Sequence, residues 1–205
     1  MLGKVKLTES EMREFAEVFA NYDYGTDEIG MVPLFPGYPD TERLVEYLVA
    51  MIRTANDYNA VYATSENKEG IIILTDTTDP FPSAAMVKML WRMARALGFK
   101  NFGDIMKKFQ AGGASQEKTY RDSKEPFVQI ELLAVRERYQ GQGFMRPLVE
   151  TAFEVAREKH LPVIVSTDAA LKKDKYAHLG MEHVNTRILA EGSYMYDLVR
   201  RSDSN

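Results

Sequence analysis

Apolar residues recur at helical spacing in two stretches near the start of the chain. Apolar side chains from Met12 to Phe19 follow the capping oxygens of Thr8, so residues 8–21 are predicted to form an amphipathic helix. Residues 41–57 carry the same spacing and predict a second helix.

Two β-branched runs come next, at residues 59–64 and 71–75, with a polar turn between them. This arrangement is typical of a hairpin. The second run is apolar almost throughout, which favours a central strand covered on both faces.

Residues 83–113 are predicted to contain an inserted pair of helices. The first helix opens at Ser83 and stops at Gly98, and the second runs over 102–109. Residues 115–125 are polar and charged, and we expect them to form a mobile loop.

The rest of the chain is organised around residues 128–160, where a strand, a glycine turn and a long helix follow one another. Residues 161–166 predict another buried strand, and a strand, a crossover helix and a second strand form a right-handed unit with parallel strands. Residues 182–189 and 194–199 then predict a closing hairpin.

Composition limits the class of protein. A length of 205 residues with 45% hydrophobic residues fits one domain with a full core, residues 1–205. The chain has no cysteine and three scattered histidines, so we expect no disulfide, no thiolate site and no metal. No apolar run approaches the roughly 20 residues of a membrane span, and the net charge is −4. We therefore expect a cytoplasmic protein without a nucleic-acid or membrane partner.

The glycine turn is a candidate anion site. Gly141 and Gly143 let the backbone turn sharply, and the helix that follows directs unpaired amides and its positive dipole end at the turn. A Lys-Ser or Lys-Thr pair is missing after Gly143, which argues against a P-loop, and Arg146 stands where a dinucleotide fingerprint needs a third glycine.

The sequence from Leu133 to Met145, LAVRERYQGQGFM, resembles motif A of the GNAT acyltransferases. This resemblance implies an α/β (α+β) fold with a mixed central sheet, splayed parallel strands and flanking helices. It also implies that the anion is the pyrophosphate of acetyl-CoA, used as a co-substrate. Met145 occupies the last Gly/Ala position of the motif.

Residues 172–181 resemble a second GNAT element, a short helix that ends in Tyr-x-x-Leu-Gly-Phe, with Tyr176 on the tyrosine. Lys172 stands where many relatives carry asparagine. Together the two resemblances assign the following cofactor contacts: Leu133, Ala134, Val135, Arg136, Gln140, Gly141, Gln142, Gly143, Phe144, Met145, Arg146 and Lys172. They also imply that residues 126–200 form the acetyl-CoA-binding half and 1–125 the acceptor-side half.

Acetyl transfer from a thioester to an amine needs a base for the amine and an acid for the departing thiolate. The resemblance makes Tyr176 the candidate acid and Glu131 the candidate base. Strand alternation gives Glu131 the opposite facing to Ile130 and Leu132, which is compatible with the cleft or with solvent. Arg136 and its neighbours Arg138 and Arg146 are candidates for phosphate contacts or for solvated charges.

The acceptor side is less defined. Residues 22–39 combine aromatic, acidic and proline residues, which is compatible with a surface loop or with a wall for an amine substrate. We expect these residues and the helices within 83–109 to line the acceptor side. The sequence thus predicts an N-acetyltransferase acting on a small-molecule amine. The alternative is a non-catalytic acyl-CoA sensor or interaction module, and a homodimer is left open.

Overall fold

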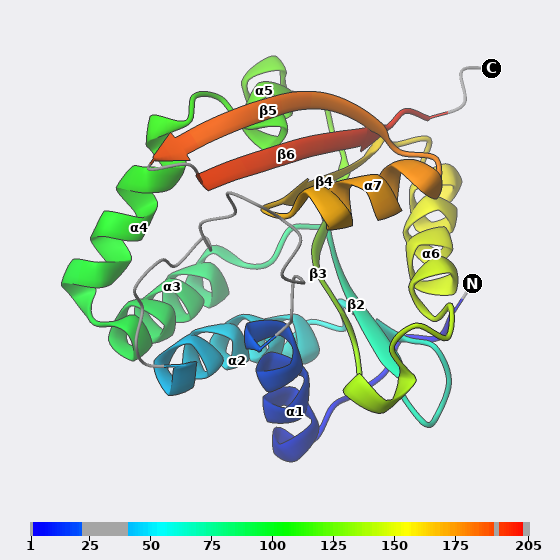
Figure 1. Ribbon diagram of the computed structural model, residues 1–205, viewed down its shortest axis with the longest axis horizontal. Helices are drawn as coiled ribbons and strands as arrows, with labels where there is room; N and C mark the ends of the chain where they lie inside the picture. Colours follow the sequence, from blue (N-terminus) through cyan, green and yellow to red (C-terminus); the bar gives the residue numbers. More distant parts are fainter. Residues whose placement is uncertain (1, 22–40, 191–192, 203–205) are drawn as a thin grey trace.

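The computed structural model describes residues 2–21, 41–190 and 193–202. Figure 1 shows helices on both faces of one curved sheet. The helices are α1 (Glu9–Ala20), α2 (Thr41–Asp57), α3 (Ser83–Leu97), α4 (Phe99–Ala111), α5 (Gln116–Ser123), α6 (Met145–Glu158) and α7 (Ala170–His178), with a 3-10 turn η1 (Glu137–Tyr139). The strands are β1 (Val61–Ala63), β2 (Gly70–Asp76), β3 (Val128–Val135), β4 (Val163–Thr167), β5 (Glu182–Ala190) and β6 (Ser193–Arg200).

The sheet has the order β1-β2-β3-β4-β6-β5. β3 and β4 pair in parallel, as the crossover helix between them requires, and the other neighbouring strands pair antiparallel. The α/β fold with a mixed sheet is therefore confirmed. Both expected hairpins form, β1 with β2 and β5 with β6, although residues 191–192 between the last two strands lie outside the described residues.

Two apolar clusters hold the helices on the sheet. On one face α1 and α2 pack over β2 and β3, with Phe15 and Ile52 fully buried. On the other face α6 and α7 pack over β3 and β4, with Leu148 and Tyr176 in the cluster. A smaller cluster around Phe127 seats α5 on the same face as α1 and α2.

Strand β3 contains one extra residue relative to β2. Ile73 pairs with Leu132 and Leu74 pairs with Ile130, so Glu131 has no partner on β2 and forms a β-bulge. Because a bulge reverses the alternation of side chains, Ile130 packs under α6 whereas Leu132 packs under α1 and α2. The expectation that Ile130 and Leu132 share a face is therefore wrong.

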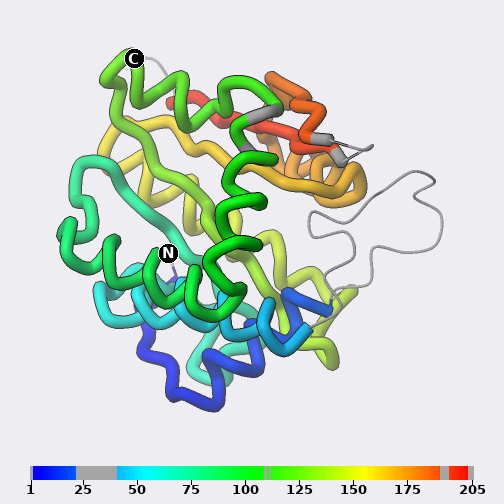
Figure 2. The backbone as a smooth tube through the Cα atoms, turned by 90° about the vertical axis from the view of Figure 1, so that its left-hand side faces the viewer, coloured from blue at the N-terminus to red at the C-terminus, as the bar shows by residue number. Residues whose placement is uncertain are grey.

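The inserted helices form, with different bounds. α3 ends at Gly98, whose φ of +83° breaks the helix. The Gly98 carbonyl accepts a hydrogen bond from Phe102 N at 3.0 Å, so α4 begins at once, at Phe99 rather than Phe102. The two helices reach along one side of the molecule, α3 against α2 and α4 against β5 (Figure 2).

The stretch expected to be a mobile loop, residues 115–125, is mostly helix α5. Ser115 caps it by accepting from Lys118 N at 3.1 Å, and Lys118 and Asp122 form an i,i+4 ion pair at 2.8 Å. α5 buries none of its residues, so it lacks the apolar stripe by which a helix is recognised in sequence.

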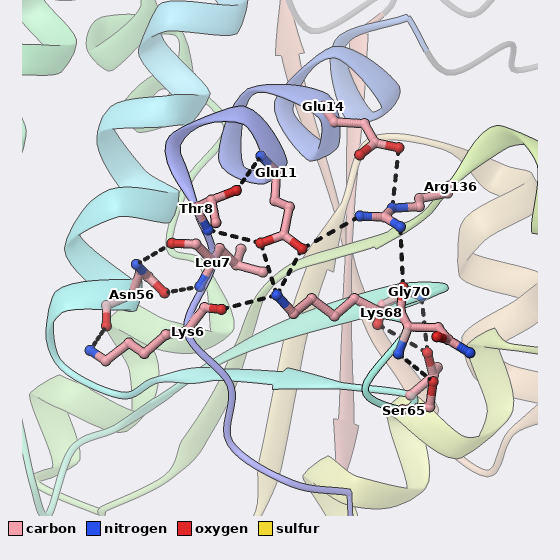
Figure 3. A network of polar contacts seen from close by, with 12 residues as sticks. Lys6, Leu7, Thr8, Glu11, Glu14, Asn56, Ser65, Lys68, Gly70 and Arg136 are labelled. Carbon is pink, nitrogen blue, oxygen red and sulfur yellow. Dashed lines mark hydrogen bonds and ion pairs between the residues drawn. The ribbon is translucent and has the colours of Figure 1, made fainter.

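A polar network ties the N-terminal segment to the sheet (Figure 3). Thr8 and Glu11 form a capping box at the start of α1, and Glu11 also pairs with Lys68 at 2.7 Å. The amide of Asn56 clasps Leu7, because its Oδ1 accepts from Leu7 N at 2.7 Å and its Nδ2 donates to Leu7 O at 3.1 Å. Since Asn56 and Leu7 are both buried, this side chain replaces water for both backbone groups.

Replacing Asn56 by alanine should destabilise the fold, because it leaves a buried N–H and a buried C=O of Leu7 unpaired. Each such group costs about 1–3 kcal/mol, so we expect the free energy of unfolding in urea to fall by about 2–5 kcal/mol. Asn67→Ala, in an exposed turn, is the matched control and should change it by about 0.5 kcal/mol or less. Equal urea midpoints of unfolding for both variants would mean that the two Asn56–Leu7 hydrogen bonds contribute little to stability.

Candidate active site

Strands β3 and β4 pair over only three residues. Val128, Gln129 and Ile130 pair with Val163, Ile164 and Val165, and no further pair forms although both strands continue. Beyond this point β3 remains paired with β2, and β4 with β6. The sheet therefore opens between the two strands among the described residues. Each strand keeps one edge with backbone groups that an amide-bearing ligand can pair with.

A cavity of about 1130 Å³ lies at this opening. Its walls come from β3, the glycine turn, the end of β4, α7, and the facing sides of α1 and α2. Most of the residues expected in the site line it: Glu131, Leu133, Ala134, Val135, Gln140, Gly141, Gly143, Phe144, Met145, Arg146, Lys172 and Tyr176. The fold thus brings together side chains from the two motif segments.

Glu131 belongs to the cavity wall because the bulge directs it there. The Thr75 hydroxyl donates to Glu131 Oε1 at 2.6 Å, and Gln129 Nε2 donates to Oε2 at 3.3 Å. Glu131 is an exposed residue of β3 whose surface faces the cavity, and the protein atoms packed around the cavity partly desolvate its carboxylate. The resulting desolvation raises its pKa to about 7, against the opposing effect of the Thr75 hydrogen bond. A carboxylate with this pKa is suited to take up a proton near neutral pH.

Tyr176 reaches the same cavity from α7. Its side chain is 6% exposed, and burial raises the pKa of its phenol well above the usual value. The phenol therefore stays protonated at neutral pH. Within the described part of the chain it has no hydrogen-bond partner, so its proton is available to a ligand.

The glycine turn has the backbone expected of an anion site. Gly141 and Gly143 adopt φ of +74° and +86°, which residues with a β-carbon rarely do. α6 begins at Met145 with no side-chain cap and no acid in its first turn, and of its first amides Arg146 N donates to Gly143 O at 3.2 Å, so the anion site depends on the other amides of the turn. Arg146 lines the cavity beside them.

Two of the expected cofactor contacts lie elsewhere. The Arg136 guanidinium is 11% exposed, stacks on Phe15, and pairs with Glu14 at 3.1 Å, facing α1 (Figure 3). The Gln142 side chain donates a hydrogen bond to Arg138 O at 2.8 Å, so it is used within the turn. Neither residue lines the cavity, so the structure does not bring these two side chains together with the other expected contacts. Arg136 follows β3 directly, and it pairs with the acidic residues Glu11 and Glu14 of α1 instead of facing the cavity.

The expected acceptor wall also changes. Among the described side chains of α3 and α4 none lines the cavity, because these helices pack behind α2 and against β5. The described wall opposite the glycine turn comes instead from α1 and α2, with Phe19, Leu44, Leu48 and Met51. Residues 22–39, the other expected part of this wall, lie outside the described residues.

Several site residues were not found from the sequence. Thr75 and Gln129, which hold Glu131, are directly opposite in the register of β2 and β3. Tyr47 of α2 lines the cavity, and burial together with the charge of Glu131 raises its pKa to about 12. Thr75 and Gln129 could have been noticed in the sequence as polar residues within otherwise apolar strands. Only the strand register shows that they meet the carboxylate.

Ser166 occupies the first position of β4 beyond its last pair with β3, and it lines the cavity. Its hydroxyl donates to Asp197 Oδ1 at 2.6 Å. Asp197 is fully buried and forms two bonds with Arg187, at 2.9 and 3.0 Å. This buried pair fixes the edge of β4 at the opening, where the loss of the β3 ladder would otherwise leave it less constrained.

A mixed sheet that opens between two parallel strands, beside a glycine turn and a helix N-terminus, defines an acyltransferase fold. Residues 81–178 match the model of the acetyltransferase (GNAT) family. Over these residues the chain is similar to this family, as the two motif segments indicated, and the family implies acetyl-CoA as co-substrate. Among curated proteins no match to the sequence is found.

Solved structures share the fold at low identity. A polyamine N-acetyltransferase of Drosophila melanogaster, which forms N-acetylagmatine, superposes with a TM-score of 0.56 at 13% identity, covering 96% of this chain and 97% of that one. A putative arylalkylamine N-acetyltransferase 7 of the yellow fever mosquito Aedes aegypti gives 0.57 at 14% identity, covering 97% and 86%. The C-terminal condensation domain of Ebony, in complex with β-alanyl-dopamine, gives 0.59 at 11% identity, covering 98% and 99%.

None of the described helices combines the length and apolar character that crossing a bilayer requires. Within the described residues no cluster of three histidine, cysteine or acidic side chains is placed to bind a metal ion.

Proposed function

We propose that the protein transfers the acetyl group of acetyl-CoA directly to the amine of a small molecule. The observation that carries this proposal is the position of Glu131 and Tyr176 on the walls of one cavity, at the opening between β3 and β4. One group accepts a proton near neutral pH and the other keeps its proton. Direct transfer needs this pair.

The donor side consists of the glycine turn and the unpaired edge of β3. The amides around Gly141 and Gly143, with Arg146, suit a pyrophosphate. Backbone groups of Leu133 to Val135 suit an arm that carries amides. The cavity has room for an extended ligand and for a second reactant beside it.

On the acceptor side, Glu131 removes a proton from the amine, either directly or through a water molecule. The nitrogen lone pair then forms a bond to the thioester carbonyl carbon, and the carbon–sulfur bond breaks. Tyr176 donates its proton to the leaving thiolate and takes up, through water, the second proton that the nitrogen releases, so the products are an amide and the free thiol. Since an alkyl amine has a pKa of about 10.4 and a thiol about 8.5, both proton transfers lower the barrier at neutral pH.

The apolar residues of α1 and α2 fit the organic part of the acceptor. Phe19, Leu44, Leu48 and Met51 face the cavity together with Tyr47. Structural neighbours carry the names of agmatine, polyamine and arylalkylamine acetyltransferases, which supports a small amine as acceptor. An acyl-CoA sensor would bind the donor and release no thiol, and an assay of CoA release against a panel of amines separates the two functions.

Gly143→Val should weaken acetyl-CoA binding by about tenfold or more, because valine disfavours the φ of +86° and its side chain obstructs the approach of phosphate. A β-carbon at Gly143 meets no protein atom within 4 Å, so the fold should survive. Calorimetric titration measures the effect, and Gly3→Val, also in open space, is the control. Wild-type affinity in Gly143→Val would place the phosphates elsewhere.

Glu131→Gln should remove the catalytic base. At pH 8, kcat/KM should fall by about 10²- to 10⁴-fold. Because Glu131 is protonated and inactive well below its pKa of about 7, the ratio of wild-type to variant rate should rise with pH and level off above 7. The ratio cancels the titration of the amine itself. Glu158→Gln, on the exposed side of α6, should show no such trend. A ratio that stays constant with pH would exclude Glu131 as the base.

Tyr176→Phe should lower kcat by about 10²- to 10⁴-fold with little change in acetyl-CoA affinity, because only the acid is removed. Donors whose thiol has a lower pKa should show a smaller loss, since their leaving group needs less help. Tyr120→Phe, on α5 outside the cavity, serves as the control. Wild-type turnover by Tyr176→Phe, under conditions where chemistry limits the rate, would leave the reaction to proximity alone.

A further inference from the structure

The inserted helices α3 and α4 do not contribute to the cavity, yet their surface is unlike that of the rest of the molecule. Five bulky apolar side chains are exposed on them: Met86, Val87, Leu90, Trp91 and Phe99, at 37%, 67%, 44%, 52% and 67%. In Figure 2, α4 faces the viewer and α3 lies beside it, on the side of the molecule that is at the left in Figure 1. We call these five residues and the basic residues beside them the α3–α4 face.

The segment formed by α3 and α4 is positively charged, whereas the chain as a whole is negatively charged. Six basic residues, Lys88, Arg92, Arg95, Lys100, Lys107 and Lys108, stand between Ser83 and Ala111 with Asp104 as the one acid, whereas the whole chain has a net charge of −4. None of the six forms an ion pair with another described residue. Their charge is therefore not neutralised within the described part of the protein. Arg95 stacks over the Trp91 ring at 5.4 Å.

Apolar and basic side chains alternate on this face. Val87 precedes Lys88, Trp91 precedes Arg92, and Phe99 precedes Lys100. The core of a protein–protein interface is depleted of charge, particularly of lysine, so this mixture is a poor match for one. Lys and Arg interleaved with Trp, Phe and Leu are typical of helices that lie in a lipid headgroup layer. There the rings and aliphatic groups enter the acyl boundary and the cations meet anionic lipid.

We propose that the α3–α4 face docks the protein on an anionic lipid surface. Docking of this kind is peripheral and agrees with the lack of a spanning helix among the described residues. It departs from the expectation of no membrane partner, which rested on the absence of a long apolar run. The cavity lies on the other side of α2 and does not include this face, so docking leaves it unobstructed.

Trp91 is the only tryptophan of the chain and reports on the face directly. Intact protein should co-sediment with vesicles of phosphatidylcholine containing about 30% phosphatidylglycerol, with a blue shift of tryptophan emission. It should not do so with phosphatidylcholine alone. Binding should weaken as salt is raised, because the attraction is partly electrostatic.

Substitutions on the α3–α4 face and matched substitutions elsewhere test whether this face is the one that binds the vesicles. Lys88→Gln/Lys100→Gln should reduce binding about tenfold, whereas Lys118→Gln/Arg157→Gln, which removes the same charge from exposed positions on α5 and α6, should reduce it much less. Trp91→Ala should also weaken binding, and Ile188→Ala, an apolar residue 63% exposed on β5, should not. Acetyl-CoA binding by all four variants should equal that of the wild type, which controls for folding.

Four outcomes would overturn the proposal. One is the absence of binding to the anionic vesicles at low salt. Another is binding with unshifted Trp91 emission, or equal losses in the two charge variants, because either places the contact elsewhere. The last is a dimer in solution, detected by light scattering, that Trp91→Ala dissociates, because the occupant of the face is then a second copy of the chain.

Discussion

The opening between β3 and β4 is the feature on which the rest of the site depends. Hydrogen bonds join these strands as far as Ile130 and Val165, and the following residue of β3, Glu131, is a bulge. An extra residue bends its strand and increases its twist, which favours separation from a neighbour that has no matching bulge. The same bulge directs the carboxylate into the cavity and moves Leu132 to the core under α2. One local irregularity therefore lies where the gap begins and turns Glu131 towards the cavity.

Burial then gives the two reactive groups different protonation states. Desolvation disfavours the charged form of an acid, so it raises the pKa of both Glu131 and Tyr176. The pKa of the Glu131 carboxyl becomes about 7, so this group titrates near neutral pH. The pKa of the Tyr176 phenol rises well above its usual value, so the phenol stays protonated there. The Thr75 hydroxyl limits the first effect by donating to the carboxylate. The same cavity thus suits Glu131 to accept a proton and Tyr176 to hold one.

Helix α2 lies between the cavity and helix α3. On one side Leu44, Tyr47, Leu48 and Met51 line the cavity, and on the other side the helix carries α3. The basic and apolar α3–α4 face is thereby kept apart from the site. The insertion between β2 and β3 leaves after Asp76 and returns at Val128, which pair at one end of the two strands, so it does not disturb the strands that line the cavity.

The sequence by itself determined the secondary structure around the motifs and the composition of the site. Apolar spacing predicted α1, α2, α3 and the strands, because burying one face is a local property of a helix or strand. It missed α5, whose stability comes from a cap and ion pairs. Only the tertiary structure decided which side chains meet: that Glu131 is a bulge, that Arg136 turns to α1, and that α2 rather than α3 walls the cavity. These depend on strand register and helix packing between residues far apart in the chain, and no local pattern records them.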